Sequence, residues 1–362
     1  YFGAAELTLF EEYSIKAVAV ILTKRPDGSK GYSFLLIVSV EFNPPWDLFM
    51  GIRLKGLGGL VGTHRSIDLN AFREGIRDDR FDAILFPDDP VGNAPTIVST
   101  MTTLFPFAEG RYAFGFLGRL EWGTSKLVDM KIGILVEVPN PVKIAIVGTV
   151  KMTVEKGDLQ VLKFKLNFLI AIDFGKKIFS VDAALYDSTF VKTVVQGEFY
   201  LRVTWGEQPF SLASVGGWHP AIQPPAQLNL PAKPKRLGVM LMNSDRIKLG
   251  FEFYVALMSN SFQIGAALEL KVKVSKFRLE AGLSLDALFR SLSDFQVDFS
   301  GKLLIFWGDN RLAGITVQGA LFGTEPWRIK GSATFSIWIW DYDVDFDVSS
   351  GPETGEIQQS LE

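Results

Sequence analysis

Apolar and polar side chains alternate along most of the chain, and this period of two is the feature that most constrains its fold. The segment 162–172 shows it clearly, with an apolar side chain at each even position: Leu162, Phe164, Leu166, Phe168, Ile170 and Ile172. Successive side chains of a β-strand point to opposite faces of a sheet, so the pattern predicts strands with one apolar face. It recurs on the order of fifteen times, with tight turns between, as in an antiparallel meander.

Length and composition agree with a large β protein. The chain has 362 residues, of which 48% are apolar and 21% charged, and it contains 30 Phe and 34 Gly. This length exceeds the size at which one compact core stops growing, so we expect two cores or one elongated sheet. Mean hydropathy is +0.20. A value this high indicates that one face of most strands is apolar and must be covered by something.

Two stretches interrupt the alternation. Residues 66–105 are predicted to be a helical insert, because Asp68 can cap one helix, and Asn93 with Pro95 can open another. We expect these helices to cover part of the apolar sheet face. The glycine-rich run 56–62 precedes the insert and predicts close backbone packing at the junction of sheet and helix, because it lacks the spacing of a phosphate-binding loop.

The second interruption divides the chain. Five prolines between residues 218 and 236 favour an extended crossing segment, since proline cannot donate to a sheet ladder. We therefore predict a β-meander half with the helical insert over 1–205, a Gly/Pro-rich crossing segment over 206–235, and a second meander half over 236–362. The sequence allows the second half to be continuous with the first sheet or separate from it. The fold class is all-β: a long-stranded antiparallel meander that forms a curved sheet, a trough or an incomplete barrel. Turns are predicted at 139–141, 157–158 and 243–245.

Composition also argues against several classes of function. The chain has no cysteine, which removes disulfides and thiolate chemistry without fixing a compartment. The net charge is −3 and the basic residues are dispersed, so we expect no nucleic-acid partner. No window approaches the apolar length of a membrane-spanning helix. The chain opens at Tyr1 without an initiator Met or a signal-peptide pattern, and we expect it to be a piece of a longer protein.

An enzyme is the least favoured class, and we expect no cofactor. The chain has two histidines, His64 and His219, and neither lies near a G-x-S-x-G nucleophile motif. Both are expected to be structural, with ring nitrogens bonded to backbone carbonyls. Glycoside hydrolysis needs only two carboxylates, but the sequence singles out no pair.

Four aspartates near the C-terminus form one candidate metal site. Asp341, Asp343, Asp345 and Asp347 alternate with apolar residues, so a strand would align them on one face about 7 Å apart. Such carboxylates could share a calcium ion with oxygens from a neighbouring strand. The favoured alternative is a solvated face that discourages edge-to-edge pairing of sheets.

Several segments together resemble the uncharacterised bacterial and fungal family called domain of unknown function 6603. They are residues 56–62, 82–90 running into 93–95, 214–220, and 326–331 leading into 335–336 and ending at 345–348. They keep their order over most of the chain. The resemblance implies no activity, because none is established for that family.

Two functions remain close to parity. The first is a non-enzymatic module whose apolar face binds or lines a lipid-like ligand, with a candidate lining of Phe164, Leu166, Phe168, Ile170, Phe199, Leu201, Leu268 and Leu270. The alternative is a structural or assembly module of a larger surface-associated or particle-associated protein. Its partners would be further copies of itself or other domains of a longer parent chain. A filled core and a ligand-filled trough would have the same strand pattern, so the sequence does not separate the two.

Overall fold

The computed structural model describes residues 1–25, 27–123, 127–156, 159–191, 193–291, 293–323 and 326–350. The chain divides into two compact units. Unit 1 comprises Tyr1–Ala213 with Pro225–Pro231, and unit 2 comprises Ser214–Pro224 with Ala232–Glu362. Each unit is built on an antiparallel β-meander, which confirms the predicted fold class.

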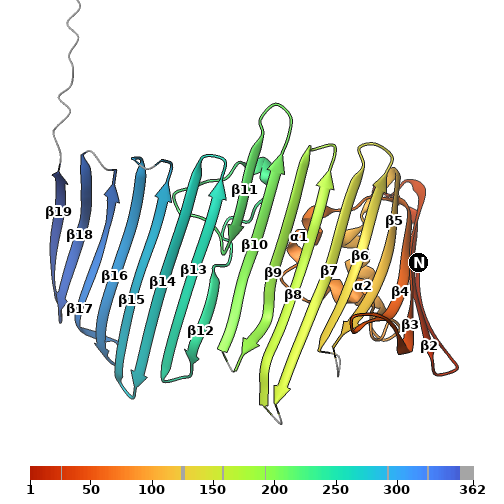
Figure 1. The fold of residues 1–362 in the computed structure, drawn as a ribbon, viewed down its shortest axis with the longest axis horizontal. Helices are drawn as coiled ribbons and strands as arrows, with labels where there is room; N and C mark the ends of the chain where they lie inside the picture. The colour runs from red at the N-terminus through yellow and green to blue at the C-terminus, as the bar shows by residue number, and fades with distance from the viewer. Residues whose placement is uncertain are drawn as a thin grey trace, which may run out of the picture. The chain divides into compact units, whose positions relative to one another are not determined.

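Unit 1 contains strands that pair with their neighbours in chain order, as Figure 1 shows. The strands are β1 (Phe2–Leu9), β2 (Tyr13–Lys24), β3 (Lys30–Phe49), β4 (Ile52–Arg65), β5 (Phe107–Trp122), β6 (Val128–Val138), β7 (Lys143–Lys156), β8 (Leu159–Asp173), β9 (Ile178–Phe190) and β10 (Thr193–Thr204), followed by β11 (Phe210–Val215), which begins in unit 1 and ends in unit 2. The turn predicted at 139–141 joins β6 to β7. The turn predicted at 157–158 lies outside the described residues.

The helical insert lies between β4 and β5, as predicted. It contains α1 (Leu69–Gly75), η1 (Asp79–Phe81), α2 (Asp82–Leu85) and α3 (Ala94–Leu104). Asp68 caps α1, because its carboxylate accepts hydrogen bonds from the backbone N–H groups of Asn70 and Ala71. At α3 the N-cap is Asn93, which makes no side-chain cap bond, and a proline occupies the first turn.

Cross-strand register gives the meander of unit 1 two chemically different faces. One row of neighbours runs Ile134, Ile146, Ile170, Val181 and Leu201 over five strands. We define the apolar face as the side that carries the even-numbered residues of 34–40, 112–122, 128–138, 144–154 and 162–172 and the odd-numbered residues of 57–63, 179–185 and 197–203. None of these residues is charged. The opposite side is the helix-bearing face.

The expectation that the helices cover the apolar face is wrong. The insert lies against the opposite face, where Lys131 Nζ donates to the carbonyl of Phe86 at 2.9 Å and Asn167 Nδ2 donates to the carbonyl of Asp78 at 2.6 Å. Figure 1 shows the insert on one side of β6–β9 only. Short helices end in unpaired carbonyl groups that need donors when buried, and an uncharged apolar face has none to offer.

The helix-bearing face also supplies the hydrophobic core of unit 1. Its strands interleave charged residues with leucine, alanine, valine and glycine, and the apolar members pack against aromatic side chains of the insert. The buried core includes Phe72, Phe81, Phe86 and Phe105 from the insert and Leu35, Leu117, Leu135, Val147 and Leu169 from the strands. The predicted close packing of the glycine-rich run is confirmed, since a Cβ at Gly56 would lie 3.0 Å from the Phe86 ring and 2.8 Å from the carbonyl oxygen of Val40.

Unit 2 carries a second meander with the same separation of side chains. Its strands are β12 (Leu237–Asn243), β13 (Ile247–Met258), β14 (Ser261–Val274), β15 (Phe277–Phe289), β16 (Phe295–Trp307), β17 (Asn310–Phe322), β18 (Trp327–Ile337) and β19 (Trp340–Ser350). A row of Phe251, Leu268, Leu283, Gly301 and Val317 marks its apolar side. The proline-rich stretch between β11 and β12 contains a 3-10 turn at Ala226–Leu228, and no strand among the residues described there.

The described residues form nineteen strands, more than the roughly fifteen expected from alternation. The difference comes in part from short strands. β1, β11 and β12 have 8, 6 and 7 residues. A segment this short contains too few alternations for the period alone to distinguish a strand from an irregular segment.

The two faces predict opposite results for two strand glycines. Gly56→Val, on the helix-bearing face, should reduce the free energy of unfolding by about 1–3 kcal/mol, because its side chain would overlap Phe86 and the β3 backbone. Gly118→Val, on the apolar face, should be neutral or slightly stabilising, because a Cβ there meets no described atom within 4 Å. Urea unfolding followed by circular dichroism measures both. Equal losses would contradict the assignment of the faces.

Candidate functional site

The apolar face of unit 1 exposes many hydrophobic side chains. Its side chains pack only beside one another along the sheet, and many stay accessible: Leu57, Val61, Phe114 and Ile134 are 43–45% exposed, and Phe116 is 77% exposed. The insert lies on the opposite side. The described residues of unit 1 therefore leave this face open.

The size of the apolar face sets it apart from the scattered exposed hydrophobics of ordinary proteins. With strands about 4.8 Å apart and a rise of about 3.4 Å per residue, eight strands and ten or so residues span about 35 Å in each direction. Even a conservative outline gives about 1,000 Å². The largest apolar patch on a typical monomer is about 300–600 Å², and larger patches mark interaction surfaces.

The structure gathers most of the candidate lining residues on this face. Phe164, Leu166, Phe168 and Ile170 lie on β8, and Phe199 and Leu201 lie on β10, joined through β9 in the rows Phe168, Ala183, Phe199 and Ile170, Val181, Leu201. All six are half-buried by their neighbours. They form part of an open sheet surface.

The remaining two candidates, Leu268 and Leu270, lie on the apolar side of β14 in unit 2. Leu268 contributes to a shallow depression of about 550 Å³ on that side. Its other apolar lining residues are Phe251, Ala266, Ala267, Leu283, Leu285, Phe299 and Val317.

The aspartate ladder lies on β19, which pairs with β18 and is exposed along most of its length. Three of its carboxylates have cross-strand partners. Arg311 donates to Asp341 at 2.5 Å, the Thr334 hydroxyl donates to Asp343 at 2.7 Å, and Arg328 donates to Asp347 at 2.7 Å. Arg328 lowers the pKa of Asp347. The pKa of Asp341 is also lowered, first by a hydrogen bond from Ser336 and then by Arg311.

The ladder does not converge on one point. Among the residues that the structure describes, no three His, Cys, Asp or Glu side chains are placed so that they could hold a metal ion. In the same residues, no helix is long and apolar enough to cross a bilayer.

Both histidines contact backbone groups. His64 Nδ1 accepts a hydrogen bond from the backbone N–H of Gly110 at 2.9 Å. His219 is fully buried in unit 2, where its Nδ1 accepts from the N–H of Ala221 at 3.2 Å and its Nε2 lies 3.3 Å from the carbonyl of Asp286. The ring nitrogens thus bond to the backbone as expected, but Nδ1 accepts from an amide in both cases.

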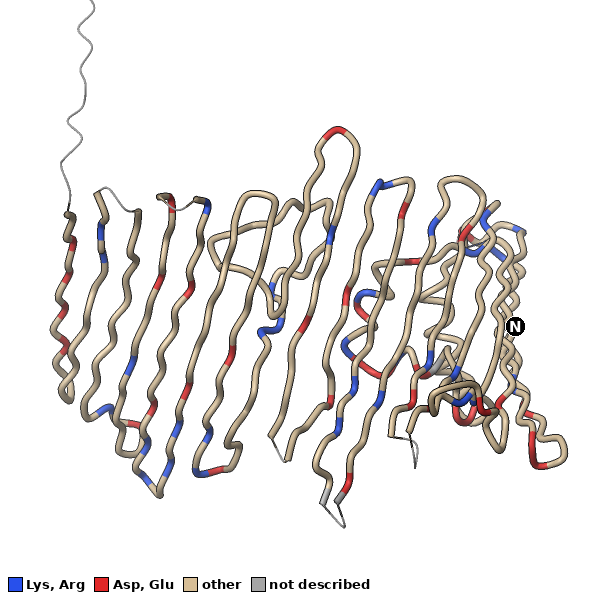
Figure 2. Tube along the Cα trace, in the orientation of Figure 1, with Lys and Arg blue, Asp and Glu red and all other residues tan. Residues whose placement is uncertain are grey.

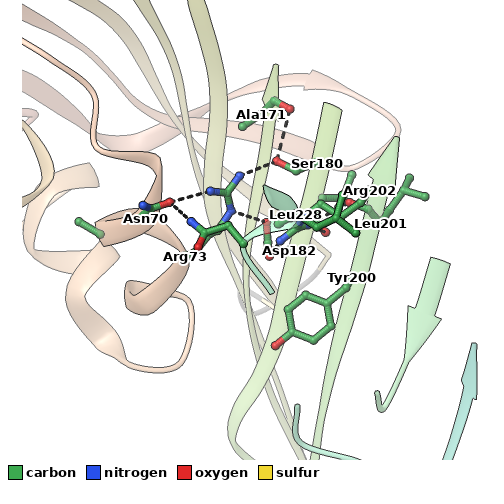
Figure 3. Close-up of polar contacts among 12 residues, drawn as sticks. Asn70, Arg73, Ala171, Ser180, Asp182, Tyr200, Leu201, Arg202 and Leu228 are labelled. Atoms are coloured by element: carbon green, nitrogen blue, oxygen red, sulfur yellow. Dashed lines mark hydrogen bonds and ion pairs between the residues drawn. The ribbon is translucent and has the colours of Figure 1, made fainter. Parts of the chain in front are cut away.

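A group of charged side chains is buried between α1 and the helix-bearing face, as Figure 3 shows. The carboxylate of Asp182 on β9 accepts from Arg202 Nη2 of β10 at 2.6 Å and from Arg73 Nε of α1 at 3.3 Å. Arg73 also donates to the Ser180 hydroxyl at 3.0 Å and to Asn70 Oδ1 at 2.9 Å. Burial lowers the pKa of Arg73, against the opposing effect of Asp182.

A neighbouring pair continues this network. Arg77 Nε, just beyond α1, donates to Glu198 Oε1 at 2.6 Å, and the Tyr200 hydroxyl donates to the other oxygen of Glu198 at 2.5 Å. Burial, and then the carboxylate of Glu198, raise the pKa of Tyr200 well above its usual range. Arg73 and Arg77 therefore clamp one end of the insert to β9 and β10.

A second network fixes the middle of the insert. Asp82 of α2 forms an ion pair with Lys131 of β6 at 3.0 Å and a second ion pair with Lys151 of β7. Burial would raise the pKa of Asp82, but the two lysines outweigh it and the pKa is lowered. Lys16 of β2 donates to the carbonyl of Pro87 at 2.9 Å. The charges of the helix-bearing face thus bind the insert, and Arg73, Arg77 and Asp182 also line a small cleft of about 210 Å³ beside it.

The sequence contains a signal for these networks in the spacing of its charged residues. On β9 and β10 the charged residues Asp182, Glu198 and Arg202 occupy the phase opposite to an uninterrupted apolar phase. Charged side chains at such positions must either be exposed to water or be paired with opposite charges beneath a covering element. Arg73 and Arg77 are four residues apart, which suits one helical face supplying that cover.

The comparison with known proteins yields one match. A family model described as a family of unknown function (DUF6603) matches residues 1–362. No curated protein matches the chain, and no solved structure does.

The Asp82 pairs predict a pH-dependent loss of stability. Asp82→Asn leaves Lys131 buried without its counter-ion and should reduce the free energy of unfolding by about 3 kcal/mol at neutral pH. Because the folded-state pKa of Asp82 is lowered, its contribution is fully present above about pH 4 and is lost as pH falls through the folded pKa. The difference between wild type and variant should therefore shrink below about pH 4.

Chemical denaturation at several pH values tests this, with Asp187→Asn as the control. Asp187 also pairs with two lysines, Lys163 and Lys165, but its side chain is 55% exposed. Its replacement should cost less than about 1 kcal/mol. A loss for Asp82→Asn that stays constant into acid, or that matches the control, would refute the buried-pair interpretation.

Proposed function

The chain belongs to the family of unknown function DUF6603 along its whole length, and we propose that it is a non-enzymatic assembly module whose apolar face is covered by another apolar protein surface. One observation carries the proposal: the uncharged face of unit 1 is open, while the helices of the same unit cover its charged face. Leaving so large an apolar area in water is unfavourable by about 25 cal/mol per Å². The same area makes association with another apolar surface favourable.

The shape of the face favours a broad partner over a small ligand. Small-molecule sites are concave and bury about 70–90% of the ligand surface. The apolar face of unit 1 is one side of a sheet, and a ligand laid on it would keep its other side in water. Two sheets packed face to face about 10 Å apart cover such surfaces fully. The geometry therefore supports an assembly role more strongly than a single bound lipid in unit 1.

The non-enzymatic part of the proposal rests on where the charged groups lie. The buried carboxylates of Asp82, Asp182 and Glu198 each pair with a cation from the insert or from a neighbouring strand. Groups committed in this way position the helices and have low freedom to exchange protons with a substrate.

A second candidate function is supported by the depression in unit 2. Its volume of about 550 Å³ lies within the range of about 300–1,000 Å³ that is usual for ligand sites, and its walls are mostly aliphatic and aromatic. A single acyl chain is the kind of ligand that such a surface would hold. Leu268, one of the candidate lining residues, lies in it.

Charged substitutions on the apolar face separate the two functions. The variant Phe114→Lys with Ile134→Lys should keep the thermal unfolding midpoint of the wild type within a few degrees, because both side chains are 44% exposed. It should lower the fluorescence of an anionic hydrophobic dye bound to dilute protein by at least half, because the dye reports exposed apolar surface.

The control places the same charges elsewhere, with Phe10→Lys and Val91→Lys. These side chains are 88% and 55% exposed and lie outside the apolar face. Native mass spectrometry completes the test. A wild-type chain free of ligand supports assembly. A stoichiometric lipid that is lost from the Phe114→Lys, Ile134→Lys variant and kept by the control would overturn assembly through this face in favour of lipid carriage. A lipid that this variant keeps and that Leu268→Lys loses would instead support the depression of unit 2 as a ligand site.

A further inference from the structure

One side chain stands out from the apolar face. Phe116 is 77% exposed, far more than its neighbours Phe114 and Ile134 at 44%. It lies near the middle of β5, between Gly59 on β4 and Ile134 on β6. A phenylalanine this exposed inside a long strand leaves most of its ring in water, so burial of the ring by a partner would be favourable.

An empty notch lies directly beside this ring. Gly59 is the cross-strand partner of Phe116, and Gly118 is the next residue of β5 on the same face. A Cβ at Gly118 would meet no described atom within 4 Å, and one at Gly59 would meet only the carbonyl oxygen of Gly115, at 3.5 Å. Both glycines are therefore open on the apolar face.

The same face shows how a glycine is filled within the chain. A Cβ at Gly148 would lie 2.5 Å from the ring of Phe168, its cross-strand partner on β8, so that ring covers the glycine. Cross-strand aromatic cover of a strand glycine is a known stabilising device. Phe116 and Gly59 have the same cross-strand relation, yet the ring of Phe116 does not cover Gly59.

We propose that two copies of this chain associate through the apolar faces of unit 1, with Phe116 of each copy inserted in the notch at Gly59 and Gly118 of the other. This deepens the proposed function, on which it rests. A projection and a recess side by side on one surface are self-complementary under a two-fold rotation, which is what an isologous dimer requires. A two-fold axis between Phe116 and the notch makes both contacts at once.

The area and the charge of the face fit a stable dimer. A standard protein interface buries about 800 Å² on each partner, and the apolar face offers about 1,000 Å². Figure 2 shows the lysines, arginines, aspartates and glutamates along the chain, and none belongs to the residues that define this face. Pairing two such faces therefore desolvates no charge, and a central aromatic anchor in a recess is typical of the residues that dominate binding.

Sedimentation equilibrium of the purified chain over nanomolar to micromolar concentrations tests the proposal. The wild type should reach twice the 40.2-kDa mass of the chain. Phe116→Asp should weaken the dimer at least about 30-fold, as expected for a central anchor. Phe10→Asp, a change at a phenylalanine that is 88% exposed in the turn after β1, should leave it unchanged.

Gly118→Val distinguishes a specific contact at the notch from nonspecific hydrophobic association. The variant adds apolar surface to the face and is expected to fold, because the site is open. Unspecific association should become stronger with it, whereas a dimer that needs the notch should weaken at least about 10-fold. Gly301→Val, at a strand glycine in unit 2 where the first contact of a Cβ is 3.4 Å away, is the matched control and should not alter the dimer.

A wild-type chain that stays monomeric at micromolar concentration overturns the dimer. So does a dimer that Phe116→Asp leaves intact, or one that Gly118→Val strengthens. These results are separate from those that judge the proposed function. A monomer that is free of ligand and binds the hydrophobic dye through Phe114 and Ile134 rejects the second copy as the partner and keeps the assembly role, whereas a lipid that is lost on Phe114→Lys, Ile134→Lys substitution rejects both.

Discussion

The separation of charge from apolar surface across one layer of backbone is the constraint on which the rest of this structure depends. A strand can present two kinds of surface only if its residues alternate, and in unit 1 the alternation holds over eight neighbouring strands in register. Slipping one strand by a single residue would move Lys131 and Glu137 onto the apolar face and Ile132 and Ile134 under the helices. The same alternation of residues therefore determines the strand register, the face on which the helices dock and the nature of the exposed surface.

Charged side chains hold the insert in place because the insert is made of short pieces. A helix of 7 residues leaves most of its terminal N–H and C=O groups outside its own hydrogen bonds. Lys16, Lys131 and Asn167 reach from the strands to carbonyls of the insert, and Arg73 and Arg77 reach back from it to carboxylates on β9 and β10. Buried ion pairs add little net stability over apolar packing, but they tolerate few alternative arrangements. They give the insert one position, while its own phenylalanines contribute the apolar burial.

Much of the fold could be predicted from the sequence because its determinants are local. Alternation correctly placed Phe168 and Phe199 on a common face, and the cap at Asp68 marked the start of α1. The covered face could not be predicted in the same way. Hydrophobicity alone assigns the helices to the apolar side, and the demand for donors at Phe86 and Asp78 becomes visible only once the loops have positions. The exposed ring of Phe116 and the notch at Gly59 and Gly118 could not be predicted from the sequence either, because the exposure of a ring depends on neighbours that lie far away in the sequence.

The glycines of β4 and β5 show how differently the two faces are used. On the helix-bearing face, a Cβ at Gly58 would lie 2.7 Å from the carbonyl oxygen of Val38, and one at Gly115 would lie 2.7 Å from Leu135, so packing within the chain excludes any larger residue. On the apolar face, Gly59 and Gly118 have neither a positive φ nor a close neighbour that excludes a side chain. A β-branched residue at these positions would stabilise the strand, since glycine in a strand loses more backbone entropy and packs nothing. Among the described residues of unit 1 no contact calls for glycine at either position. A partner that covers the face, as proposed, would supply the physical reason for both.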